Sequence, residues 1–269
     1  MTTTTAPTTP QAPGSVPDRS APLAAELLKL RRSQALVVVL GLPIVIALAG
    51  IVNTLSSGQG LADGWNTLWV RTLGFHGLFP LTLGVAILAS LVWRAEHRDG
   101  NWNALMTSPV DATRTVMAKA AAVAVLAAAM QAVMLTTILV IGKAMFGLSG
   151  LPAPHLLASG ALVTLACAPL AAFQSALAML MRSFAAPVAV GAVLAGVSVV
   201  LLTAGLGEAA YALPHALAAR TALLGSGMFG ETGVPDPATF LALAVAAVVQ
   251  MVLVVGTTGH VLGNRDTRA

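Results

Sequence analysis

The sequence predicts an all-α membrane protein with six transmembrane helices, an amphipathic N-terminal surface helix, and both termini in the cytosol. Hydrophobic residues occupy 57% of the 269 positions and charged residues only 9%, whereas an average soluble domain is about 25% charged. The mean hydropathy is +0.86. The apolar residues also gather into long runs separated by short polar segments. Such a chain is typical of proteins that cross a bilayer as helices.

The N-terminal part of the chain is expected to lie outside the bilayer. Residues 1–20 are rich in Thr, Pro and Ala and have nothing with which to bury a core, so they predict a disordered tail. Residues 21–33 predict a short amphipathic surface helix, because Leu23, Leu27 and Leu30 recur at helical spacing. The same residues also fit a plain basic flank before the first span.

Residues 34–262 contain six apolar segments and predict one transmembrane domain. Each segment has about 20 residues or more, which is the length that crosses the hydrocarbon as a helix. Residues 181–184 separate the fourth and fifth segments and predict a tight turn within a helical hairpin. Residues 263–269 form a short cytosolic tail. The predicted spans are about 34–55, 72–93, 115–142, 156–181, 185–207 and 239–262.

The distribution of Lys and Arg predicts the orientation of the chain. With the N-terminus inside, eleven basic residues lie on the inner side and three on the outer side. Inner loops of membrane proteins carry the excess of Lys and Arg. We therefore expect a multi-pass protein of the plasma membrane with both termini cytoplasmic.

Several classes of function are excluded by what the sequence lacks. The basic residues fall at the ends of apolar runs and form no basic face, which argues against nucleic acid as a partner. The single cysteine, Cys167, lies inside an apolar run and indicates neither a disulfide nor a cysteine metal site. No G-x-x-x-x-G-K-[ST] motif is present, so the chain has no phosphate-cradling loop of its own.

The predicted spans hold almost no ionisable residues. No Asp, Glu, Lys or Arg lies in the middle of a span, so no path for protons or sodium is evident. His76 is interpreted as an interface histidine with its hydrogen bonds satisfied. The amides of Gln131, Gln174 and Gln250 are expected to bond between helices.

The segment 93–119 is the one long polar stretch between two spans near the middle of the chain. Ser108 and Pro109 begin a helix, and Asp111 completes its capping box. Just before it, Trp102 and Leu105 lie on one side of a short helix. This apolar stub either enters a groove on a partner protein or anchors the loop among lipid headgroups.

This pattern resembles the type-2 ABC exporter permeases. An acidic residue at the end of the second span is followed by glycine, tryptophan, leucine and Ser-Pro, and then by an arginine and the lysine that opens the third span. The surface helix, the six spans and the long outer loop at 208–238 match as well. The small size and the tryptophan look most like the lantibiotic-immunity or multidrug export branch. The matching residues are Glu96, Gly100, Trp102, Leu105, Ser108, Pro109, Arg114 and Lys119.

The resemblance implies a mechanism and a set of partners. Two permease subunits would pair in the bilayer above two separate ATPase subunits, and the 93–119 loop would couple ATP-driven closure to the spans. ATP and Mg²⁺ would bind the ATPase, so this chain would hold no cofactor or metal and would not be an enzyme. The turn at Arg182 would make a second, smaller contact. The leucines of the loop at 208–238 predict one or two short helices packed onto the membrane surface. The resemblance implies that they are similar to re-entrant helices that cover the exit path.

Two alternatives remain beside an exporter of a hydrophobic or amphipathic peptide, drug or lipid. A gradient-driven carrier would need buried acids or broken helices at corresponding positions of two halves. A membrane-embedded enzyme would need a cluster of reactive groups near the interface, for which Glu96, His97 and Asp99 are the only candidates.

Overall fold

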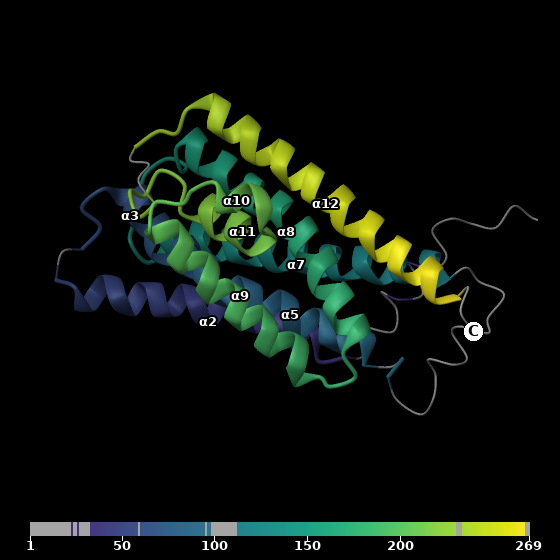
Figure 1. The fold of residues 1–269 in the computed structure, drawn as a ribbon. Coiled ribbons are helices and arrows are strands. Elements are labelled where there is room, and N and C mark those ends of the chain that lie inside the picture. Colours follow the sequence, from purple (N-terminus) through teal and green to yellow (C-terminus); the bar gives the residue numbers. More distant parts are fainter. Residues whose placement is uncertain are drawn as a thin grey trace, which may run out of the picture.

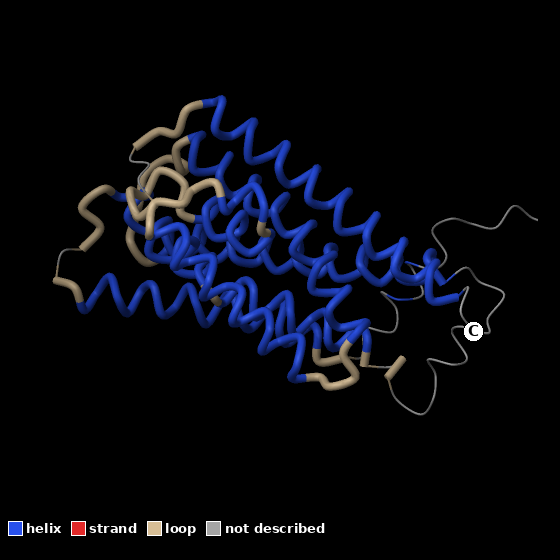
Figure 2. The backbone as a smooth tube through the Cα atoms, viewed as in Figure 1, coloured by secondary structure: helices blue, strands red, loops and turns tan. Residues whose placement is uncertain are grey.

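A computed structural model of the chain describes residues 33–58, 60–94, 96–97, 112–229 and 233–266, together with Leu23 and Glu26. The described residues form helices joined by turns and loops, and no strand occurs among them (Figure 2). The expected all-α class is therefore confirmed. The rest of the predicted surface helix at 21–33 lies outside the described residues.

Five helices are long and apolar enough to cross a membrane, namely α2, α7, α8, α9 and α12. A bent pair, made of residues 64–78 and 80–93, passes the same test as one unit and would be a sixth span. The described elements are α2 (Ala35–Ser56), α3 (Gly64–Trp69), the π-helical turn η1 (Val70–Gly74), α4 (Phe75–Leu78), α5 (Pro80–Trp93), α7 (Ala112–Ala144), α8 (Pro154–Leu180), α9 (Ala185–Thr203), α10 (Ala209–Ala212), α11 (Pro214–Ala222) and α12 (Pro237–Asp266).

The long helices run side by side in one elongated bundle (Figure 1). We call one end of it the Trp93 end, because α5 finishes there at Trp93. At this end α8 and α12 also finish, and α2, α7 and α9 begin. We call the opposite end the Trp65 end; there the Trp65 indole N–H donates to the carbonyl of Ser149 at 3.0 Å.

Helix α8 lies at the centre of the bundle and packs against α5, α7, α11 and α12. Many of its buried side chains are small, which lets neighbouring backbones approach closely. Large apolar side chains instead point outward from the peripheral helices, such as Val37 on α2, Val193 on α9 and Val252 on α12. Apolar outer faces on helices of this length are what contact with lipid tails requires.

The bent pair breaks at Phe79 and Pro80. Proline has no N–H to donate and is favoured in the first turn of a helix, so Pro80 ends the hydrogen bonding of α4 and begins α5. The two parts meet at 46°. The sequence pattern places the second span at 72–93, whereas the helical path in the structure begins at Gly64 and passes through η1.

The segment after α9 carries two short helices, α10 and α11. Nearly every side chain of α11 is buried, and the helix packs against α4, α8 and α9. It therefore lies within the bundle. Close approach to α4 is possible because residue 77 is glycine: a Cβ there would clash with the Cβ of Ala222.

Candidate functional site

Lys119 on α7 is the most deeply buried charged side chain among the described residues, with no exposed surface. Its Nζ atom lies 2.9 Å from Oε2 of Glu26 and 3.0 Å from Oε1 of Glu96. Both carboxylates are largely shielded from solvent. Burying an ammonium group is tolerated only when it is paired and hydrogen-bonded in this way.

The indole ring of Trp93 completes this group, and we call the four residues Glu26, Trp93, Glu96 and Lys119 the Lys119 cluster. The Lys119 amine lies 5.3 Å from the centre of the Trp93 ring, within cation–π range. The Trp93 indole N–H donates to Oγ of Ser175 on α8 at 2.9 Å. The cluster therefore joins the N-terminal segment, α5, α7 and α8.

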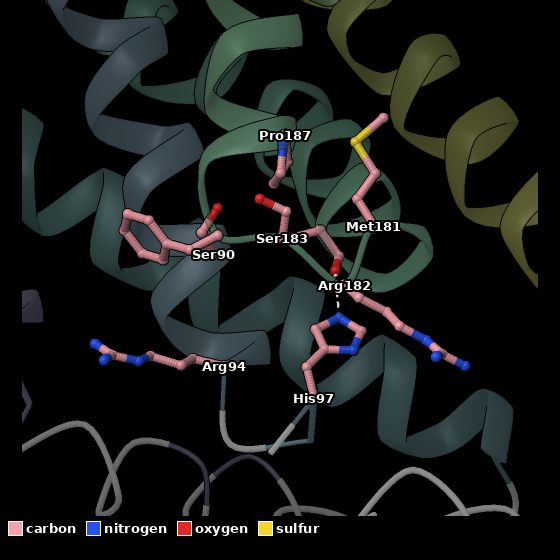
Figure 3. A pocket seen from close by; sticks show the side chains of 9 residues that line it. Ser90, Arg94, His97, Met181, Arg182, Ser183 and Pro187 are labelled. Atoms are coloured by element: carbon pink, nitrogen blue, oxygen red, sulfur yellow. Dashed lines mark hydrogen bonds between the residues drawn. The ribbon is translucent and has the colours of Figure 1, made fainter.

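His97 makes a second connection to α8. Its Nε2–H donates to the carbonyl of Ala178 at 2.7 Å (Figure 3). Ala178 lies in the last turn of α8, where carbonyls have no partner within the helix. His97 therefore caps the C-terminus of α8 with a side chain from just beyond α5.

These contacts bond the residues on the two sides of the segment 98–111 to each other; we call these flanking residues the roots of the segment. Glu96 precedes the segment, Lys119 follows it, and their side chains form an ion pair. Through Trp93 and His97 the same roots are bonded to α8, the central helix.

The predicted site residues fall into three groups in the structure. Glu96 and Lys119 are in contact, while Arg114 lies half-buried on α7, nearer the start of that helix. Arg182 is exposed in the turn between α8 and α9, beside a cavity. The others lie outside the described residues: Gly100, Trp102, Leu105, Ser108 and Pro109.

Sequence reasoning missed the role of Glu26 and of Trp93. Glu26 is the only acid in residues 21–33, and Lys119 is the only charged residue in the predicted span 115–142. A lone buried cation requires a carboxylate partner, so this signal was present. The pairing itself joins positions 93 residues apart, and local spacing contains no information about it.

Polar side chains inside the bundle pair between helices, as expected. The Gln131 amide contacts Nε2 of His76 at 3.4 Å, and the Gln174 amide contacts Nε2 of His215 at 2.9 Å. Gln250 donates to the carbonyl of Ala210 at 2.9 Å. The interpretation of His76 as a satisfied interface histidine is wrong: it is fully buried between helices, and its Nδ1 has no hydrogen-bond partner among the described residues. These pairs connect α4 to α7, α8 to α11, and α10 to α12.

The described residues contain no group of three or more His, Cys, Asp or Glu side chains placed to hold a metal ion. Glu96 is paired with Lys119 and His97 with the Ala178 carbonyl. Asp99, the third member of the candidate catalytic group, lies outside the described residues.

The comparisons with known proteins agree with this architecture. No curated protein and no solved structure matches the chain significantly. A family model described as "ABC-2 family transporter protein" matches residues 22–198. The match begins just before Glu26 and includes α2 through most of α9, with the whole Lys119 cluster inside it. The chain belongs to the ABC-2 family of transporter proteins.

Proposed function

We propose that this chain is the membrane subunit of an ATP-driven exporter of the plasma membrane. The bent pair acts as one span, which gives six, and the Trp93 end faces the cytosol. Two permease subunits, identical or different, assemble with two separate ATPase subunits that bind ATP and Mg²⁺. The substrate is a hydrophobic or amphipathic peptide, drug or lipid, because the spans carry little polar decoration.

The observation that supports ATP coupling most directly is the ion pair between Glu96 and Lys119 at the roots of the segment 98–111. A docking loop transmits movement only if its roots are firmly attached to the spans. Gly100, Trp102, Leu105, Ser108, Pro109 and Arg114 form the docking stub in this proposal, and Arg182 makes the smaller second contact. Glu96 and Lys119 position the stub and do not themselves need to touch the ATPase.

The interior of the bundle favours an external energy source over an ion gradient. No carboxylate lies in the interior of the described spans. The buried imidazoles of His76 and His215 contact glutamine amides and no carboxylate among the described residues. A carrier driven by protons or sodium places ionisable groups along its path.

The proposal is tested by purifying the tagged chain from its native membranes and measuring Mg-ATP hydrolysis of the preparation. We expect hydrolysis to copurify with the chain. The Glu96→Gln variant should still reach the membrane, because Lys119 keeps Glu26 as its partner, but hydrolysis should fall several-fold. Pro109→Ala, which removes the helix start in the docking stub, should act in the same direction.

The matched control is Glu208→Gln, which neutralises an exposed acid at the Trp65 end. It should leave hydrolysis unchanged. Equal hydrolysis in all four proteins would contradict the coupling role of the segment. Drug or peptide efflux that continues in ATP-depleted vesicles under an imposed proton gradient would instead indicate a gradient-driven carrier.

A further inference from the structure

A cavity of about 190 Å³ lies at the Trp93 end between the end of α5 and the turn joining α8 to α9. This is well above the space that one water molecule needs. Its lining combines cationic and hydroxyl side chains from two separate parts of the chain. Those that matter below are Ser90, Arg94, His97, Arg182 and Ser183 (Figure 3).

Among the described residues, the cavity carries positive charge without a counterion. Arg94 and Arg182 both line it, and no acidic side chain does. Within the described part of the chain, neither guanidinium group forms an ion pair. Figure 3 shows the two arginine side chains extending to opposite sides of His97. Guanidinium groups match phosphate oxygens in charge and in their paired donors.

The start of α9 lies beside the same cavity, although Pro187, the third residue of the helix, has no N–H to offer. Ser183, Phe184 and Pro187 line the cavity and flank or belong to the start of this 19-residue helix. No side chain caps the helix, and its first turn contains no acid. The N-terminus of a helix presents free backbone N–H groups and a partial positive charge, which together favour a bound anion.

Ser90 provides an independent indication of a ligand. Only 4% of this residue is exposed, and its hydroxyl has no hydrogen-bond partner among the described residues. A buried hydroxyl without a partner is unfavourable by about 1–3 kcal/mol. Most serine and threonine hydroxyls in apolar helices avoid this by bonding back to a carbonyl of the preceding turn. Ser90 does not, and it faces the cavity.

We propose that this cavity binds a phosphate group, which Arg94, Arg182, the start of α9 and the Ser90 hydroxyl would contact. The group belongs either to the headgroup of an anionic phospholipid or to a soluble phosphate. Basic pockets between span ends on the cytosolic side suit both. This proposal rests on the proposed function only for the orientation of the bundle. It does not require ATP coupling, so phosphate binding and ATP coupling can be refuted independently.

The test uses the purified full-length chain without any ATPase. The protein would be held in detergent micelles that contain equal amounts of phosphatidylcholine and phosphatidylglycerol. Native mass spectrometry would then count the molecules of each lipid that stay bound to the protein. We expect preferential retention of phosphatidylglycerol. Arg182→Gln and Ser90→Ala should each reduce it, the former about tenfold because a charge-assisted contact is lost. Arg182 is exposed and forms no ion pair within the described part of the chain, so its variant should fold normally.

The control is Lys143→Gln, which removes one exposed positive charge at the Trp65 end. It should retain phosphatidylglycerol as the parent does. A second arm adds inorganic phosphate: binding of phosphate alone, with loss in both cavity variants, assigns the site to a soluble phosphate. Preferential lipid retention that phosphate does not displace assigns it to a headgroup.

Three results would overturn the proposal. One is equal retention of both lipids together with no binding of inorganic phosphate. Another is an equal loss in Arg182→Gln and Lys143→Gln, since this would show attraction by net charge alone. The third is unchanged binding in Ser90→Ala and Arg182→Gln, which would place the anion elsewhere on the chain.

Discussion

Lys119 lies about two turns inside α7, yet no part of its side chain reaches solvent. An isolated ammonium group at this position would be strongly unfavourable. The two carboxylates offset that cost, and the Trp93 ring adds a further favourable contact. Because the partners come from different segments, the residue also specifies how those segments are placed.

Lys119→Met should destabilise the protein by about 3–5 kcal/mol, because it leaves Glu26 and Glu96 buried beside each other without a cation. Glu96→Gln should cost less, since Lys119 keeps its bond to Glu26. Unfolding by heat or denaturant in a mild detergent measures the stability of both variants. Lys143→Met on the same helix is the control; a Lys119 variant as stable as this one would refute the role of the cluster.

The bond between Trp93 and Ser175 should appear as a coupling between two mutations. Trp93→Phe and Ser175→Ala each remove the hydrogen bond, worth about 1 kcal/mol. Trp93→Phe also removes ring volume, so the single variants are not equivalent, but a double-mutant cycle isolates the shared term. We expect the double variant to be about 1 kcal/mol more stable than the sum of the singles predicts. Strict additivity would show that the bond contributes nothing.

At the scale of elements, the bent pair and α11 form one packed unit. Helix α4 and α11 approach closely at Gly77, and the α11 face there is made of alanines. The unit lies beside α8 and α9. A second histidine–amide pair, His215 with Gln174, bonds α11 to α8 from another side.

Gly77→Ala should destabilise the bundle by about 1–3 kcal/mol, because the new methyl group overpacks the contact with Ala222. Adding Ala222→Gly should restore much of that loss. Gly41→Ala is the matched control: it lies in α2 with open space around a Cβ, so it should be neutral or stabilising. Unfolding of these three variants and the parent protein in detergent measures the differences. If Gly77→Ala behaves like Gly41→Ala, α4 and α11 do not pack as described.

For the whole molecule, the end of the bundle that faces the cytosol determines which loops an ATPase can reach. The only native cysteine, Cys167, is buried, so it can be replaced by alanine and single cysteines introduced. One variant carries Ser183→Cys, in the exposed turn at the Trp93 end. The other carries Ser149→Cys, in the exposed loop at the Trp65 end. In intact cells an impermeant thiol reagent should label only the Ser149→Cys chain. Labelling of Ser183→Cys instead would reverse the orientation.

How far the sequence predicts this structure depends on the range of the interaction. Apolar runs of about 20 residues report on helices directly, because the bilayer sets their length. The apolar pattern places Pro80 inside one span at 72–93, whereas the structure starts a new helix there and bends by 46°. The Glu26–Lys119 pair joins segments far apart along the chain. The sequence shows Glu26 and Lys119 as isolated charges, whereas the contact between them depends on the tertiary fold.

The most direct test of the proposed function asks whether the segment 98–111 touches an ATPase. In the Cys167→Ala background, Trp102→Cys would carry a short bifunctional crosslinker in native membranes. Met145→Cys, exposed at the Trp65 end, is the control. We predict that Trp102→Cys is joined to a protein with a phosphate-binding loop and that Met145→Cys is not. Crosslinking only to lipid at Trp102, or equal yields at both positions, would contradict ATP coupling through this segment.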